Sequence, residues 1–252
     1  MKRFFTILTL AVALLGNGKA MAGNFFDDLQ LKVRAGYSIG GTAPLGVPAT
    51  IRSIDAYHLT PSFLVGLDAM APIDSHWGVM AGLRFENKGM DAEITTKNYY
   101  MEVVKGGSHL AGMYTGGVRQ KVKEWLLTLP VLGTWKAGRH VTVKAGPYLS
   151  LLLSKDFSGY VFDGYLRQND PTGAKIVMGH EENERAVYDF TDDLRNFQVG
   201  VEAGIDWQLH QRLGMMADLN WGLSGIHKSN FKTIEQTLYP IYGSIGLYYK
   251  IK

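Results

Sequence analysis

Long stretches of the chain alternate between apolar residues and polar residues or glycine. In the first such stretch, one parity is apolar from Leu29 to Ile39, whereas the other carries Gln30, Lys32 and Arg34 followed by glycine and serine. The same alternation recurs over residues 77–86, 197–209, 213–222 and 241–251. A period of two places alternate side chains on opposite faces of a β-strand, so each stretch is a predicted strand with one apolar face.

Three further segments, 62–71, 123–135 and 141–154, keep the alternation less strictly and bring the predicted strands to eight. Pro130 and Pro147 lie inside the last two of these segments and remove backbone donors, so we expect a β-bulge at each.

The connections between the predicted strands are unequal in length. Three are short, at 72–76, 136–140 and 210–212, and four are long, at 41–61, 87–121, 155–195 and 225–236. Short turns at one end and long loops at the other are typical of outer-membrane barrels. We therefore predict an all-β fold, an eight-stranded antiparallel transmembrane β-barrel with short periplasmic turns and long extracellular loops.

A soluble barrel of the lipocalin type would also alternate, with its apolar face inside. Two features favour apolar residues outside, against lipid. First, the polar parity is rich in glycine and charge, which suits the narrow interior of an eight-stranded barrel. The predicted interior charge network consists of Lys32, Arg34, Asp68, Arg84, Glu86, Lys144, Glu202, Asp206 and Asp218.

The second feature is the position of the aromatic residues at the ends of the apolar faces. Near the short turns these are Trp77, Trp135, Trp207 and Tyr249. Near the long loops they are Tyr37, Phe85, Trp125, Phe197, Trp221 and Tyr239. Amphipathic rings prefer the depth of lipid headgroups, so we interpret the two sets as aromatic girdles at the two membrane interfaces.

The first 22 residues resemble a Sec signal peptide, with a charged start, an apolar run from Phe4 to Leu15 and small residues at Ala20 and Ala22. The apolar run is shorter than the roughly 20 residues of a membrane-spanning helix. We therefore expect residues 1–22 to be removed, leaving 23–252 as a single barrel domain exported to the outer membrane of a Gram-negative bacterium.

Removal of this segment changes what the charge implies. The whole chain has 26 basic and 23 acidic residues, but three of the basic ones, Lys2, Arg3 and Lys19, lie in the predicted signal peptide. The remaining chain is neutral, so its charge does not predict a nucleic-acid partner. The absence of cysteine excludes a disulfide framework and a lipid-modified N-terminal cysteine.

Two short motifs in neighbouring predicted strands, Leu-Thr-Leu-Pro at 127–130 and Ala-Gly-Pro-Tyr at 145–148, resemble paired signatures of the Bacteroidetes outer-membrane β-barrel family, which includes PorT-like proteins. That family tends to show Leu-Glu-Ile-Pro followed by Ala-Gly-Pro-Tyr. Residues 85–89 are similar to its Tyr-Ser-x-Lys-Gly motif. The chain departs from the family at Thr128, where glutamate is usual, and in lacking a terminal aromatic residue. The resemblance implies an eight-stranded barrel and no particular reaction.

The predicted loops carry the remaining candidate chemistry. All seven histidines fall in loops or turns, and Ser108 and His109 with Asp189 or Asp192 supply the residue types of a rim enzyme, such as those that modify lipid A. An acidic stretch with Glu181, Glu182, Glu184, Asp189, Asp192 and Asp193 fits no known calcium loop. Basic residues Lys97, Lys105, Arg119 and Lys121 are candidates for contact with lipopolysaccharide phosphates.

No catalytic motif, phosphate-binding loop or zinc pattern accompanies these residues, so we predict no cofactor and no enzymatic activity. We expect a non-enzymatic anchor or interaction scaffold that acts through extracellular loops, with a PorT-like secretion accessory as one version of it. Its expected partners are outer-membrane lipid, lipopolysaccharide and other envelope proteins. The alternatives are a lipid-modifying rim enzyme and a small pore.

Overall fold

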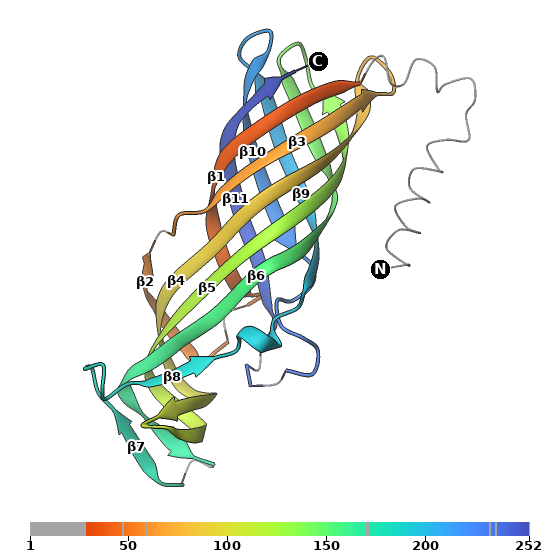
Figure 1. Ribbon diagram of the computed structural model, residues 1–252. Coiled ribbons are helices and arrows are strands. Elements are labelled where there is room, and N and C mark those ends of the chain that lie inside the picture. Colours follow the sequence, from red (N-terminus) through yellow and green to blue (C-terminus); the bar gives the residue numbers. More distant parts are fainter. Residues whose placement is uncertain are drawn as a thin grey trace.

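The computed structural model describes residues 29–251 except positions 47, 59, 170, 171, 232 and 235, so the predicted signal peptide lies outside the described residues. Eight of its strands form a closed ring: β1 (Gln30–Pro44), β3 (Phe63–Pro72), β4 (Trp77–Lys105), β5 (Ser108–Lys136), β6 (Val141–Gln168), β9 (Phe197–Gln208), β10 (Leu213–Gly222) and β11 (Leu238–Lys250). Each strand is antiparallel to both neighbours in this order, and β11 pairs back to β1 (Figure 1). The sheet therefore has no free edge around the ring.

The two faces of the ring follow the alternation of the sequence. In β10, exposed and buried residues alternate without a break, with Leu219 on the outside and Asp218 and Asn220 inside. The outer face of the other ring strands is likewise mostly apolar and exposed, whereas the inner face buries charged and polar side chains beside two small apolar clusters. This arrangement is the reverse of a water-soluble protein, in which large apolar surfaces are buried.

Strands β4, β5 and β6 are 29, 29 and 28 residues long, about twice the length of the other ring strands. They continue well beyond the ring as a protruding sheet (Figure 1). The predicted loop 87–121 is therefore wrong, because these residues form a hairpin with a turn at Gly106 and Gly107, both at positive φ. The predicted loop 155–195 is also wrong over about its first third, residues 155–168, which belong to strand β6.

The protruding sheet bends where all three long strands are irregular at the same level. Asn98 of β4, Gly116 of β5 and Asp163 of β6 have positive φ, and the β4–β5 and β5–β6 pairings shift register there. A further register shift lies at Leu153. Extra residues of this kind bend a strand and increase its twist.

The bulges predicted at Pro130 and Pro147 are absent. Pro130 pairs with Tyr148 and Pro147 with Val201 in the same register as the pairs before and after them. Each proline therefore removes a donor N–H but adds no extra residue to its strand.

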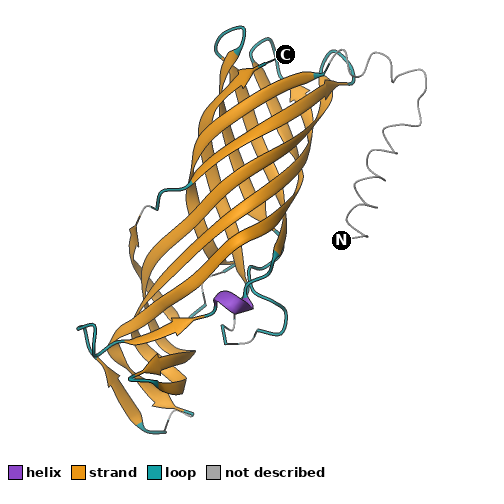
Figure 2. Ribbon diagram, viewed as in Figure 1, coloured by secondary structure: helices purple, strands orange, loops and turns teal. Residues whose placement is uncertain are grey.

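Three short strands lie outside the ring: β2 (Ile51–His58), β7 (Lys175–Met178) and β8 (Ala186–Asp189). The described residues therefore form eleven strands, three more than the eight that the sequence predicted. β2 pairs with β4, and β7 pairs with β6. β8 pairs with β6 and also contacts β4 through Val104 and Val187, so it connects the two outer long strands. A 3₁₀ helix, η1 (Thr191–Asp193), follows β8 (Figure 2).

We call the part beyond the ring the tip module: residues 90–122 of β4 and β5, residues 157–194 from β6 through η1, and residues 226–238. It has an apolar core of its own, made of Met90, Ala92, Tyr99, Met101, Val103, Tyr114, Val118, Val122, Phe157, Val161, Leu166, Met178, Ala186, Tyr188, Phe190, Leu194, Ile226 and Leu238. The ring and the tip module thus share continuous strands but have interiors of opposite character. The part of the chain that the structure describes contains no helix with the length and hydropathy needed to span a membrane.

Candidate functional site

The interior of the ring holds all nine charged residues that the sequence predicted there, and each of them is buried. They come from β1, β3, β4, β6, β9 and β10, whose inner faces meet inside the ring. Two further charged residues, Lys88 and Glu124, are also buried there and were missed. Lys88 lies in the predicted loop 87–121, and Glu124 lies at the start of the predicted strand 123–135, where the alternation is weak. Every second residue of a strand faces inwards. Continuing this rule by one step from Glu86, and by two steps back from Thr128, would have found both residues.

The half of the interior nearer the short turns contains a dense ion-pair network. The Arg34 guanidinium contacts the carboxylates of Asp68 and Asp218, with 2.9 Å to Asp218 Oδ2. Lys144 Nζ lies 2.7 Å from Asp206 Oδ1 and 2.8 Å from Asp218 Oδ1. Because each carboxylate is shared, these pairs connect strands on opposite sides of the ring.

Lys32 extends this network towards the short turns. Its Nζ lies 2.9 Å from Asp206 Oδ2 and 4.7 Å from the centre of the Tyr248 ring. Asp206 therefore accepts from two lysines, one on each of its oxygens.

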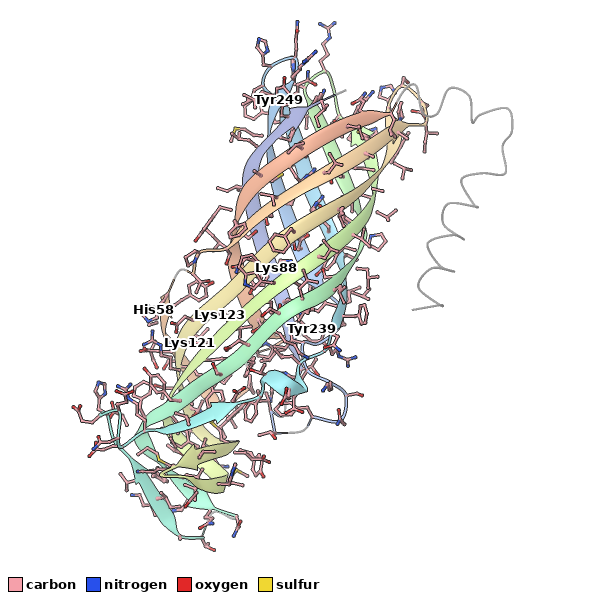
Figure 3. The ribbon with its side chains drawn as sticks, in the orientation of Figure 1. His58, Lys88, Lys121, Lys123, Tyr239 and Tyr249 are labelled. Atoms are coloured by element: carbon pink, nitrogen blue, oxygen red, sulfur yellow. The ribbon has the colours of Figure 1, made fainter. Side chains whose placement is uncertain are left out.

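The half nearer the tip module is organised by Arg84 and Lys88. Arg84 Nη1 lies 2.7 Å from Glu202 Oε2, and its Nε lies 3.6 Å from Asp68. Lys88 Nζ lies 2.9 Å from Glu86 Oε2 and 5.5 Å from the centre of the Tyr242 ring. Figure 3 shows Lys88 within the span of the ring.

Thr128 contributes a hydroxyl group to this half. Its Oγ1 lies 3.0 Å from Glu86 Oε2, to which it donates, and 2.8 Å from Ser150 Oγ. Glu124 Oε1 accepts a hydrogen bond of 2.9 Å from Gln198 Nε2. Hydrogen bonds between buried polar groups rigidify an interior, and removing one partner of a buried charge leaves that charge uncompensated.

The predicted aromatic residues all lie on the outer face of the ring or at its rim. Eight of the ten are exposed, and Trp125 and Tyr239 are half-buried. Trp125 packs between Phe63 and Phe85, with ring centres 5.5 and 5.1 Å apart. At the other end Trp77 lies 6.5 Å from Trp135, and Tyr249 lies near the C-terminus, away from Tyr239 (Figure 3). The aromatic residues thus lie at both ends of the aliphatic outer face.

A closed ring with an aliphatic outer face and a charged interior is the architecture of proteins that cross a membrane with strands. The family model described as outer membrane protein beta-barrel domain matches residues 21–228. The chain belongs to this family. It is therefore an outer-membrane β-barrel protein with antiparallel strands.

Comparison with solved structures gives distant likenesses. Ail, the attachment invasion locus protein of Yersinia pestis, is 10% identical, with 88% of this chain and 97% of that chain covered and a TM-score of 0.36. That structure is a complex with the heparin analogue sucrose octasulfate. Neisserial surface protein A is 11% identical, with 89% and 97% covered and a TM-score of 0.35. At TM-scores below 0.5 neither likeness carries an argument about this chain, and no curated protein sequence matches it.

The tip module separates the residue types proposed for a rim enzyme. His109 and Asp189 line the same cavity, but Ser108 is the first residue of β5, where it pairs with Lys105 across the turn. Asp189 Oδ1 accepts from the backbone N–H of Thr191, and no hydrogen bond joins Ser108, His109 and Asp189 among the described residues. The geometry of an activated serine is therefore not assembled.

The other loop candidates are also dispersed. Within the described ranges, no group of three or more His, Asp or Glu side chains is placed to hold a metal ion. The prediction that all histidines lie in loops or turns is wrong for His58, which is in β2, and for His109, which is in β5.

The basic residues proposed to meet lipopolysaccharide differ in their surroundings. Arg119 makes two hydrogen bonds of 2.9 Å to the carboxylate of Asp91, and Lys105 donates to the carbonyl of Val177. Lys121 and Lys123 lie on the outer side of β5, near His58 of β2 (Figure 3). Two of the four candidates are therefore engaged within the protein.

His227 of the tip module sits between two aromatic rings. Its ring lies 4.6 Å from that of Phe231 and 4.8 Å from that of Phe157. Its Nε2 is buried and has no hydrogen-bond partner among the described residues. Burial disfavours the charged imidazolium and lowers the pKa of His227 from 6.5 to about 4.

Proposed function

We propose that this protein is a non-enzymatic outer-membrane anchor that displays the tip module on the cell surface as a rigid interaction element. The observation that carries the proposal is the continuity of β4, β5 and β6 from the ring into the tip module. A hinge of loop residues would let the module move independently, whereas three hydrogen-bonded strands with a common apolar core hold it at a fixed angle.

The proposed orientation follows from the unequal ends of the ring. Outer-membrane barrels have short periplasmic turns and longer extracellular segments. The turns 73–76, 137–140 and 209–212 would then lie in the periplasm, and the tip module outside the cell. In this proposal all eight ring strands cross the bilayer, and the aromatic residues at the two ends of the outer face sit at the two headgroup layers.

An anchor is favoured over a pore by the contents of the ring. An eight-stranded barrel is just wide enough for its interior to be filled by side chains. Here the inward positions carry buried ion pairs that join strands across the ring. These side chains occupy the space that the channel of a pore would need.

The absence of cysteine makes the orientation directly testable. We would introduce single cysteines at Ser108, in the tip module, and at Gln211, in a short turn, and treat intact cells with a membrane-impermeant maleimide. We expect Ser108→Cys to be labelled on intact cells and Gln211→Cys only after the outer membrane is permeabilised. Labelling of Gln211→Cys alone on intact cells would invert the orientation and refute the surface display.

The interaction role is tested by shortening the tip module at cross-strand pairs. Ile94 faces Val118, and Val161 faces Ala186, so replacing residues 95–117 and 162–185 with short glycine-containing turns keeps the ring register. We expect the shortened protein to reach the outer membrane in normal amount but to fail to restore the phenotype of a deletion strain. Full restoration would show that the ring alone carries the function.

A PorT-like role in protein secretion is the more specific version of this proposal. It is supported by the motifs at 127–130 and 145–148, which lie on the paired strands β5 and β6 and meet where Pro130 pairs with Tyr148. The measurement is cargo export in a deletion strain. Unchanged export would remove the secretion role and leave the anchor proposal standing.

A further inference from the structure

We propose that the tip module binds an extended segment of a partner protein, which adds as a further strand to the open edge of β4 at residues 98–103. The extracellular position of this edge rests on the proposed function, whereas the pairing rests on the backbone of β4. An open edge presents a row of backbone donors and acceptors, which another extended backbone satisfies together. These groups therefore select a polypeptide over a lipid or a small molecule.

The open edge of β4 lies between two contacts with neighbouring strands. β2 pairs with β4 as far as Thr96, and the backbone N–H of Lys97 donates to the carbonyl of Thr50. β8 pairs with β4 only at Val104. Between these contacts no described strand pairs with this edge, although residues 99–103 pair with β5 on the other edge. At about 3.3 Å per residue the open stretch is about 20 Å long, which is the length of a typical β-strand.

The β4–β5 hairpin determines which backbone groups face the open edge. Its turn consists of residues 106–107, and the pair that closes a two-residue turn is hydrogen-bonded. Hydrogen-bonded and non-hydrogen-bonded pairs alternate from there along an antiparallel ladder. The N–H and C=O groups of Tyr100 and Glu102 therefore point away from β5, towards the open edge. No described residue makes a hydrogen bond to these four backbone groups.

The far side of the gap is the edge of β8. The backbone N–H of Phe190 donates to the carbonyl of Phe157, which continues the pairing of β8 with β6. Pairs alternate from this bond, so the backbone groups of Val187 and Asp189 point away from β6. Val187 meets Val104 in the single pair between β8 and β4. Beyond that pair no described backbone pairing joins the two edges, and a cavity of about 700 Å³ is lined by residues of both.

The other edges of the tip module carry features that hinder pairing. The register of β2 against β4 shifts twice, and such irregularities disrupt a continuous edge. In β7 the carbonyl of Val177 accepts a hydrogen bond from Lys105. Residues 99–103 of β4 have neither feature, since they keep a regular register with β5 and include no proline or lysine. The unprotected stretch is thus the one that borders the larger cavity.

The cavity offers space for side chains of the added strand. Successive side chains of a strand point to opposite faces, so every second side chain of the bound segment faces the cavity. Val187 is 55% exposed, and Val104 and Leu110 are partly exposed beside it in the lining. We therefore expect apolar residues at alternate positions of the segment, while its backbone hydrogen bonds supply most of the affinity.

The test uses the full-length protein in lipid nanodiscs and a library of N-acetylated heptapeptide amides randomised with valine, threonine, tyrosine, lysine and glutamate. We expect individual peptides to bind, as measured by calorimetric titration. Methylating alternate backbone nitrogens of the tightest peptide removes its donors and keeps its side chains. Methylation of one alternate set should weaken binding at least tenfold, and methylation of the other set much less. Absence of any binding peptide, or equal effects of the two sets, would overturn the proposal.

Variants of Glu102 separate backbone pairing from side-chain charge. Glu102→Pro removes the N–H that faces the open edge, and a proline on an edge strand leaves the ladder to β5 intact. We expect it to weaken peptide binding at least tenfold. Glu102→Thr removes the carboxylate but keeps the N–H and should cause a much smaller loss. Equal losses in the two variants would assign binding to the carboxylate and overturn the proposal.

A matched proline outside the edge is the control. Glu182→Pro lies in an exposed turn, in which the N–H of Glu184 donates to the carbonyl of Glu181, and should change binding less than twofold. Resistance to trypsin checks that each variant is folded. If Glu102→Pro is digested, Tyr100→Pro and Tyr100→Thr repeat the comparison, because the N–H of Tyr100 faces the same edge.

A second copy of the chain is the alternative occupant of the edge. Wild-type protein that is dimeric in detergent, with Glu102→Pro monomeric, would assign the edge to a second copy and overturn a partner protein. These outcomes are distinguishable from that of the proposed function, because the orientation is measured by maleimide labelling of cells. A periplasmic tip module would refute the surface display without affecting the titration, and a failed titration would leave the display intact.

Discussion

Replacing Arg84 with methionine tests whether the interior ion pairs hold the barrel together. Arg84 is fully buried, and its guanidinium contacts Glu202 at 2.7 Å and Asp68 at 3.6 Å. Asp68 keeps Arg34 as a partner, but Glu202 has no other ion-pair partner among the described residues. The substitution therefore leaves one carboxylate buried without a cation.

The magnitude follows from this geometry. Removing one partner of a buried pair typically costs about 3–5 kcal/mol, because the remaining charge is uncompensated. Replacing both partners with apolar residues of similar size is often close to neutral. We therefore expect Arg84→Met to lower the free energy of unfolding by about 3–5 kcal/mol, and Arg84→Met with Glu202→Leu to recover most of that loss.

The assay is urea unfolding in phospholipid vesicles, followed by the fluorescence of the five tryptophans, all of which lie on the outer face. Arg139→Met, in a short exposed turn, is the control and should unfold like the wild type. The reasoning is refuted if Arg84→Met costs less than about 1 kcal/mol, or if the double variant is less stable than either single variant.

Three further predictions follow from the outer face and the tip module. Val143→Arg places a charge on the outer face of β6 and should reduce the yield of protein in the membrane far more than Lys144→Arg, which keeps a buried charge one residue later. Equal yields would show that the assignment of outer and inner faces is wrong. Phe157→Ala should destabilise the tip module by about 3–5 kcal/mol, because Phe157 is fully buried in its core. Trypsin should then cleave the tip module while the barrel stays resistant. Cleavage of both parts at the same time would mean that they unfold as one unit. Because the pKa of His227 is about 4 when folded and 6.5 when unfolded, its stabilising contribution is complete above pH 6.5 and is lost as the pH falls to about 4, by up to about 3 kcal/mol. The protection factors of residues 224–238, which are hydrogen-exchange rates corrected for the intrinsic effect of pH, should therefore fall over that range in the wild type and much less in His227→Leu, and identical pH profiles would exclude this histidine as the cause.

The ring strands and the facing of their side chains could be predicted from the sequence. A strand between lipid and a packed polar interior must alternate with a period of two, and a shift of one residue would place charges against lipid. The segments from Leu29, Trp77, Phe197 and Leu213 show this alternation, and the structure buries each of the nine charged residues assigned to the inner parity. That the outer face contacts lipid is a prediction that Val143→Arg tests, and the role of the aromatic residues as membrane girdles also stays a prediction.

The tip module could not be predicted in the same way, because the apolar parity inverts at the edge of the ring. In β5 the apolar residues Leu127 and Trp125 face outwards, whereas Val122 and Val118 a few residues away face inwards into the apolar core. The sequence shows this inversion as a loss of alternation, which is also the signature of a loop. The strand continues nevertheless, because only the surroundings of its two faces change. In the ring these are lipid outside and a charged interior, and in the tip module they are water outside and an apolar core.

The sequence by itself therefore determined the ring strands and which of their side chains face outwards. It did so because lipid on one face and polar packing on the other impose a pattern on successive residues. Only the tertiary structure decided which charges meet, such as Arg84 with Glu202, 118 residues apart, and how β8 closes the tip module against β4. These contacts depend on the curvature of the sheet and on bulges at single residues, and a difference of one residue in register changes them while leaving the local pattern intact.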